Sequence, residues 1–294
     1  MKVGALSEGC FVNLESVVVL SALNSPAREY LSESLAAPQT IAPLPRVCAQ
    51  LAELTAQQAT DATQLSRLIQ SDPALAGEIM RVANSPALRP RAAIVSLQQA
   101  VSWLGVAEVR NIAMAVMLRG EVFVAHGHEP ESEELWREAW LAGLWAKEIA
   151  RERRKHVESA FLAALMHRTG AALALKILSR FELERRTVMD ARTFGDLIVE
   201  FEPAFGRVLM NGWLLPKDVQ DAATDWRNYR DSNHSDLAGT VHAAHLLATH
   251  TLHPQLLGED LVIESPVFEQ LGVFPDDRRR MLAKRDHVRG LAGI

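Results

Sequence analysis

Residues 161–176, which read FLAALMHRTGAALALK, constrain the fold more than any other stretch of the chain. The run has no proline and little β-branching, which predicts a helix buried on most sides and broken near Gly170. Two side chains in it, His167 and Arg168, are unusual for a core. A buried guanidinium without partners costs about 3 to 5 kcal/mol, so the rest of the chain must supply them. The alternative is a helix end at the surface, since glycine commonly follows a helix terminus.

Capping residues predict several helices in the first half of the chain. Asp72 stands directly before Pro73, which suits the first turn of a helix. Ser96 caps a second helix that Gly105 ends, and a longer apolar helix is predicted over 106–124. No stretch alternates polar and apolar residues for long enough to predict a strand. The sequence therefore predicts an all-α fold, a multi-helix bundle formed by helix-on-helix packing.

The second half of the chain shows the same helical spacing. Residues 135–149 form the most clearly amphipathic stretch, and Glu138 lies beside its apolar stripe. Pro203 and Pro216 are each predicted to begin a helix, since proline is tolerated in a first turn. A further helix is predicted over 236–251.

Prolines and polar turns divide the chain into predicted parts. Three prolines within residues 38–45 prevent regular structure there. The polar turn at 127–132 is predicted to join two helical units. The predicted parts are an N-terminal extension or linker over 1–40, a domain over 41–250 with an N-terminal helical subdomain at 45–125 and a bundle at 131–250, and a C-terminal tail over 251–294.

The composition argues against several classes of function. The net charge of −5 disfavours a nucleic-acid binder, whose affinity comes mostly from Lys and Arg. The apolar stretch at 17–20 is too short for a membrane span or a signal peptide. Cys10 and Cys48 form neither a disulfide framework nor a zinc motif. These features predict a cytoplasmic protein that contacts neither nucleic acid nor membrane.

Tryptophan and histidine are both frequent enough to need an interpretation. Four tryptophans fall on predicted helices, at Trp103, Trp136, Trp140 and Trp145. Helix packing accounts for them, and the alternative is that some line a groove for a partner. The histidines lack acidic residues at matching spacing, which favours ordinary surface or core positions over a metal site. Motifs for a Ser or Cys nucleophile, a phosphate-binding glycine loop or a dinucleotide fold are absent from the sequence.

A series of short motifs, in order and at consistent spacing, resembles the HDOD domain, the HD-related output domain of bacterial signalling proteins. The motifs are Leu44-Pro45, Ser71-Asp72-Pro73-Ala74-Leu75, Arg81 to Ser85, Ser96 to Gly105, Leu135-Trp136, Ala163 to Gly170, Phe205-Gly206, Trp213 and Leu215-Pro216. The resemblance covers roughly residues 40–250. It implies a helical bundle distantly similar to HD-type metal-dependent phosphohydrolases, used mainly for regulation and protein contacts.

The residues at the HD metal positions depart from the hydrolase pattern. In HD hydrolases, His and Asp side chains from several helices converge on metal ions. Aligning the motifs places Glu138 at the first His, Arg168 at the Asp of the His-Asp pair, and Glu202, Asp225 or Trp226, and His245 at the later ligand positions. Only His167 keeps its family identity. Because a guanidinium cannot lose its proton, Arg168 repels a cation where one would bind.

The resemblance therefore implies a degenerate metal site without a catalytic or cofactor metal. The alternative is a fortuitous metal site formed by Glu138, His167, Glu202 and His245. We expect Arg168 to neutralise Glu138 and Glu202, with Asp225 as a third candidate partner.

These observations predict a non-enzymatic signal-transduction module that binds a protein partner. Two other functions stay open at this point. One is a diverged phosphohydrolase or phosphodiesterase, and the other is a sensor that binds a nucleotide or another small molecule in the vestigial pocket.

Overall fold

The computed structural model describes residues 26–37, 50, 62–70, 72–84, 93–213 and 215–292. Every regular element in these ranges is a helix, which confirms the all-α prediction. The first elements are α1 (Pro26–Ala36), α3 (Ala62–Gln70), α4 (Pro73–Ala83), α5 (Leu97–Leu104), α6 (Val106–Glu121), α7 (Glu129–Glu152) and α8 (Val157–Met166). They are followed by α9 (Thr169–Arg185), α10 (Ala191–Gly212), α11 (Lys217–Asp225), the 3-10 turn η3 (Trp226–Asn228) and α12 (Ser235–Leu252). The last are α13 (Glu259–Ile263), α14 (Pro266–Gln270), α15 (Pro275–Leu282) and α16 (Arg285–Ala292). The predicted helix start at Pro45 and the two cysteines lie outside the described residues.

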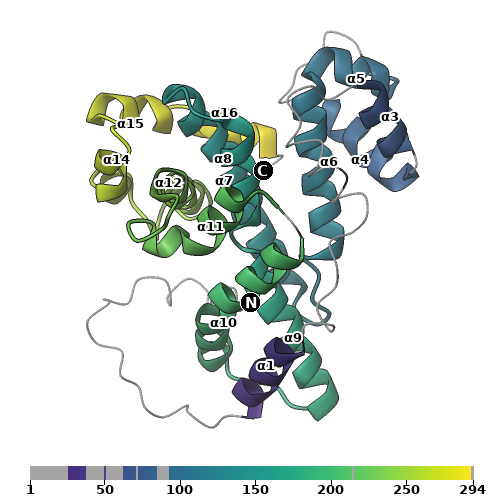
Figure 1. Cartoon of the computed structure of the whole chain (residues 1–294), viewed down its shortest axis with the longest axis vertical. Helices are drawn as coiled ribbons and strands as arrows, with labels where there is room; N and C mark the ends of the chain where they lie inside the picture. Colours follow the sequence, from purple (N-terminus) through teal and green to yellow (C-terminus); the bar gives the residue numbers. More distant parts are fainter. Residues whose placement is uncertain are drawn as a thin grey trace.

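The helices form two groups that share one core. In Figure 1, α3, α4 and α5 gather around one end of the long α6. Helix α7 then packs on α8, α12 and α16, and α9 packs on α10. One continuous apolar cluster includes Leu75 of α4, Ile112 of α6 and Trp145 of α7. Lys147 also forms an ion pair with Glu108, which ties α7 to α6.

The predicted central helix is two helices, α8 and α9. The break falls at His167 and Arg168, just before Gly170, in agreement with the predicted break near Gly170. Residues 157–185 together are long and apolar enough to cross a membrane, but 83% of the tested window is buried. That burial is typical of the core helices of a folded domain. At this break His167 and Arg168 belong to neither helix, yet both side chains are buried.

Pro203 lies inside α10, so the prediction that it begins a helix is wrong. Asp190 caps this helix instead, and its carboxylate accepts a hydrogen bond from the backbone N–H of Thr193. The helix continues past the proline because Phe201 and Phe205 lie at helical spacing and both are buried. Tertiary packing thus outweighs the local cost of proline within a helix.

Both ends of the described chain carry packed helices that the sequence interpretation missed. Helix α1 falls in the predicted linker, yet Leu31 is fully buried and the Tyr30 hydroxyl donates to Glu184 of α9. The predicted tail contains α13 to α16, which bury Phe268 and Val288. These helices are five to eight residues long, and such short helices give little periodic signal in sequence. Residues 251–292 are therefore part of the folded bundle.

Candidate functional site

Arg168 lies between two carboxylates that come from separate helices. Its Nε donates to Glu138 Oε2 of α7 at 2.9 Å, and its Nη1 donates to Glu202 Oε1 of α10 at 2.5 Å. The side chains of Arg168 and Glu202 are 8% and 4% exposed, and that of Glu138 is 17% exposed. Charge-assisted hydrogen bonds shielded from water in this way are among the stronger polar interactions in proteins. The guanidinium therefore joins α7 and α10 through the α8–α9 break.

A second arginine, which the sequence interpretation missed, completes the charge balance. Arg227 Nη2 lies 2.7 Å from Glu202 Oε2, and its guanidinium lies over the Trp226 ring at 4.2 Å from the centroid. Glu138, Arg168, Glu202 and Arg227 thus alternate in charge. We call these four residues the buried charge cluster. The cluster has no net formal charge, which limits the cost of burying it.

Gly170 brings α9 against α10 at the position of Glu202. A Cβ added to Gly170 would lie 2.1 Å from the Glu202 carbonyl oxygen and 2.7 Å from the Gly206 backbone nitrogen. Only glycine fits such a close backbone approach. The residue read in sequence as a helix break therefore sets the spacing between Arg168 and Glu202.

His167 and His245 form a second, neutral part of the site. His167 Nδ1 lies 2.5 Å from the Ala164 carbonyl oxygen, so this nitrogen carries the proton and donates. His167 Nε2 is then an acceptor, and it receives a hydrogen bond from His245 Nδ1 at 3.1 Å. The Trp226 ring packs on both imidazoles, with centroids 5.0 Å from His167 and 4.4 Å from His245.

Burial and charge hold these histidines in the neutral form. Desolvation by burial sets the pKa of His167 well below its ordinary value, and the Arg168 charge lowers it further. The pKa of His245 is also well below its ordinary value, first because of burial. Burial lowers the pKa of the nearby His242 to about 4. Glu138 shifts the other way: burial raises its pKa, although Arg168 opposes the shift.

We expect acid to destabilise the fold through these histidines. A histidine whose pKa is lower in the folded state contributes stability that is complete above pH ~6.5 and is lost as the pH falls below that value. His242 alone should cost on the order of 1 to 2 kcal/mol between pH 7 and pH 5. The raised pKa of Glu138 opposes this trend, because the folded state then takes up a proton more readily than the unfolded chain. Urea unfolding at a series of pH values measures the net slope.

Two substitutions separate the histidine contribution. His242→Asn should flatten the slope between pH 7 and pH 5, while the exposed His287→Asn should leave it unchanged. A slope that is the same in His242→Asn and wild type would contradict this account.

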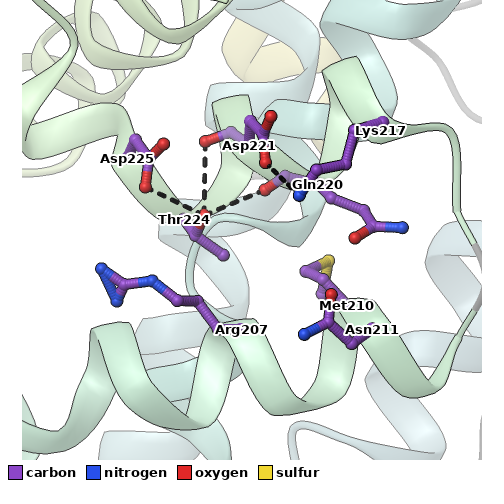
Figure 2. A pocket seen from close by; sticks show the side chains of 8 residues that line it. All are labelled: Arg207, Met210, Asn211, Lys217, Gln220, Asp221, Thr224 and Asp225. Carbon is purple, nitrogen blue, oxygen red and sulfur yellow. Dashed lines mark hydrogen bonds and ion pairs between the residues drawn. The ribbon is translucent and has the colours of Figure 1, made fainter. Parts of the chain in front are cut away.

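Asp225 lies in a different polar pocket. Its Oδ1 accepts a hydrogen bond from Thr224 Oγ1 at 3.2 Å. Figure 2 shows it with Arg207 of α10 and Lys217 and Asp221 of α11 around a pocket of about 160 Å³. Lys217 is paired with Asp221 at 2.7 Å. The structure thus brings together Glu138, Arg168 and Glu202, adds His167 and His245 beside them, and assigns Asp225 to the α10–α11 pocket.

The residues do not fit the divalent ion that HD-type hydrolases use. The Arg168 guanidinium occupies the space between the Glu138 and Glu202 carboxylates. His167 has both ring nitrogens engaged. In the part of the chain that the structure describes, no three His, Cys, Asp or Glu side chains are grouped as a metal site would require. A permanent cation, part of the chain itself, takes the central position.

Solved structures share this fold at low sequence identity. They include an HDOD domain protein of unknown function from Geobacter sulfurreducens, with a TM-score of 0.70, 16% identity, and coverage of 90% of this chain and 98% of that one. A candidate phosphohydrolase of Shewanella amazonensis SB2B gives a TM-score of 0.68, 18% identity, and coverage of 90% and 97%. A candidate signal transduction protein of Marinobacter aquaeolei VT8 gives 0.68, 21% identity, and coverage of 91% and 65%. No curated protein gives a significant match.

The sequence itself identifies the family. Residues 41–229, which include helices α3 to α11, match the HDOD domain. The match spans more than half of the chain and includes Glu138, Arg168, Glu202 and Arg227. The fold of the solved relatives agrees with it. The chain therefore belongs to the HDOD domain family.

Proposed function

We propose that this HDOD protein is a non-catalytic regulatory module of signal transduction that acts by binding another protein. The observation that carries the proposal is the Arg168 guanidinium between Glu138 and Glu202. A guanidinium neither activates water nor gives up a proton near neutral pH, so it cannot do the work of a metal in phosphoester hydrolysis. It holds helices together instead.

Family membership supports a regulatory role for the chain, and one structural relative is named as a candidate signal transduction protein. Other relatives are named as candidate phosphohydrolases, and at 18% and 19% identity they share the fold with this chain. We also propose that the protein is cytoplasmic and uses no cofactor. We propose no contact with nucleic acid or membrane, because its net charge of −5 disfavours binding to these anionic surfaces.

Metal content and hydrolysis test the proposal together. Protein purified without added metal should contain far less than one transition-metal ion per chain. With Mn²⁺ or Mg²⁺ added, it should not hydrolyse bis(p-nitrophenyl) phosphate above the rate of a buffer blank. Both results follow if the buried charge cluster stands in place of a metal centre.

His167→Ala is the matched control, because it removes the one residue that keeps the HD identity. Hydrolysis that persists in this variant comes from a contaminant. Stoichiometric metal together with hydrolysis that His167→Ala abolishes would overturn the proposal. A melting temperature raised by a nucleotide in a thermal-shift screen would favour the sensor function instead.

A further inference from the structure

Two small surfaces with exposed apolar side chains lie at opposite ends of the helical bundle. The α9–α10 surface is the turn between these helices, where Leu183 is 76% and Val188 is 89% exposed. The α13–α15 surface is formed by α13 and the start of α15, where Leu261 is 59% and Phe274 is 71% exposed. Figure 1 shows α14 and α15 at the end of the bundle away from α1, which packs on α9 and α10. The two surfaces therefore cannot meet within one chain.

The α9–α10 surface has a fixed shape. Arg186 ends α9 with a φ of 51°, in the left-handed region. The Met189 N–H donates to the Glu182 carboxylate at 2.6 Å, and this carboxylate also lies 2.7 Å from His128 Nε2. These contacts hold Val188 against the last turn of α9. Glycine is the usual residue at such a helix end, because an L side chain is strained there. The helix end alone therefore does not account for an arginine at this position.

The unpaired charge of the α9–α10 surface is positive. Its remaining carboxylates already have partners, since Glu184 lies 3.2 Å from Arg180 and Asp190 caps α10. Arg185 and Arg186 are both exposed, and neither forms an ion pair with any residue that the structure describes. Two guanidinium groups are therefore available to a partner beside the exposed aliphatic side chains.

The unpaired charge of the α13–α15 surface is negative. Residues 254–277 contain six carboxylates and no Lys or Arg. The six are Glu259, Asp260, Glu264, Glu269, Asp276 and Asp277. The last two pair with arginines of α15, whereas the first four are exposed and form no ion pair within the described ranges. The half-buried Arg278 donates to the carbonyl oxygens of Ile263 at 2.6 Å and Val273 at 2.7 Å, which holds α13 beside the start of α15.

We propose that the α9–α10 surface of one chain binds the α13–α15 surface of a second copy, head to tail. The chain itself carries both halves of this contact, because the two surfaces are alike in exposed apolar side chains and opposite in unpaired charge. The aliphatic pair of the first surface covers Leu261 and Phe274, and Arg185 and Arg186 face the carboxylates of α13. Such a contact joins two different surfaces, so the assembly grows by adding chains unless it closes into a ring. Self-assembly of this kind does not depend on the proposed function, which concerns a different protein.

Sedimentation velocity of the full chain measures the assembly. At low ionic strength, the weight-average mass should rise with concentration from 32.4 kDa to beyond twice this value. We expect a Kd on the order of 100 µM or tighter for each contact. Raising the salt concentration to ~0.5 M should weaken the association by about tenfold, because the charges that form the contact are exposed and are screened by salt.

Two variants each remove one surface. Arg185→Glu combined with Arg186→Glu reverses the charge of the α9–α10 surface. Phe274→Asp removes the most exposed apolar side chain of the other surface, and aspartate suits this N-cap position of α15. Each variant alone should stay monomeric. Mixed in equal amounts, they should form a complex of two chains that grows no further, because each variant supplies the surface that the other lacks. Formation of this complex also shows that both variants fold.

Matched controls come from the N-terminal helices. Arg67→Glu makes the same charge change on an exposed residue of α3. Val95→Asp makes the same kind of apolar-to-acidic change at a residue as exposed as Leu183. Both control variants should associate as wild type does.

Three results would overturn the inference. They are wild-type protein that remains monomeric at ~1 mM, single-surface variants that associate as the controls do, and monomeric variants that form no complex when mixed. Each of these results would leave the proposed function untouched.

Discussion

Replacing Arg168 by methionine is expected to lower the free energy of unfolding by about 2 to 4 kcal/mol, because it leaves Glu138 without its counter-charge and Glu202 with Arg227 alone. Methionine fills a similar apolar volume but cannot donate to Glu138 or Glu202. Burial already raises the pKa of Glu138 even with Arg168 present. Without the guanidinium, the two carboxylates repel each other in a site that excludes most water. Urea denaturation at pH 7 measures the loss. The slope of the unfolding free energy against urea concentration should stay unchanged.

Two further substitutions define what Arg168 contributes. Arg207→Met removes an exposed arginine from α10 and should change stability by no more than ~0.5 kcal/mol. Arg168→Asp should be more destabilising than Arg168→Met, since it adds a third negative charge to the cluster. It should not restore hydrolysis, because Glu138 and Glu202 still stand where hydrolases have other ligands. Melting of Arg168→Met within a degree of wild type would contradict this account.

Replacing Gly170 by alanine is expected to be at least as damaging, with a loss of about 3 kcal/mol or more from overpacking. The new methyl group would meet the Glu202 carbonyl oxygen at 2.1 Å and the Gly206 nitrogen at 2.7 Å. Both contacts are backbone atoms that cannot move without shifting α10 from α9. Such a shift also separates Arg168 from Glu202. Thermal and urea unfolding measure the effect.

The opposite side of the same crossing supplies the control. A Cβ on Gly206 would meet Thr224 Cγ2 at 3.6 Å, an ordinary van der Waals contact. Gly206→Ala should therefore stay within ~1 kcal/mol of wild type, since alanine also suits a helix interior better than glycine. Equal stability of Gly170→Ala and Gly206→Ala would show that the close approach is not what determines stability here.

Local signals in the sequence predicted the helices well where caps and apolar spacing agree. Ser96 caps α5 through the Gln99 N–H, and Gly105 ends it with a positive φ of 84°. The fold class followed from the absence of any alternating stretch. Long-range packing was not visible in the same way. Leu31 and Phe268 are buried by contacts with distant helices, so α1 and α14 escaped prediction.

The candidate site was predictable only in part. The apolar surroundings of Arg168 indicated that partners were needed, and the motif alignment pointed to Glu138 and Glu202. Arg227 carries no local signal, since its role depends on the tertiary approach of η3 to α10. The motif alignment left Asp225 and Trp226 as alternatives for one position. A shift of one residue on a helix changes the direction of a side chain by about 100°, so the alignment did not place Asp225 correctly.

A double-mutant cycle between Arg168 and Glu202 tests most directly whether the guanidinium joins the helices through its charge. The four proteins are wild type, Arg168→Met, Glu202→Gln and the double variant, each unfolded in urea at pH 7. If the ion pair carries the stability, Glu202→Gln should relieve part of the loss caused by Arg168→Met. The coupling energy should then be about 1 to 3 kcal/mol. Losses that add within ~0.5 kcal/mol would contradict the account, because they would mean that Arg168 and Glu202 stabilise the bundle independently.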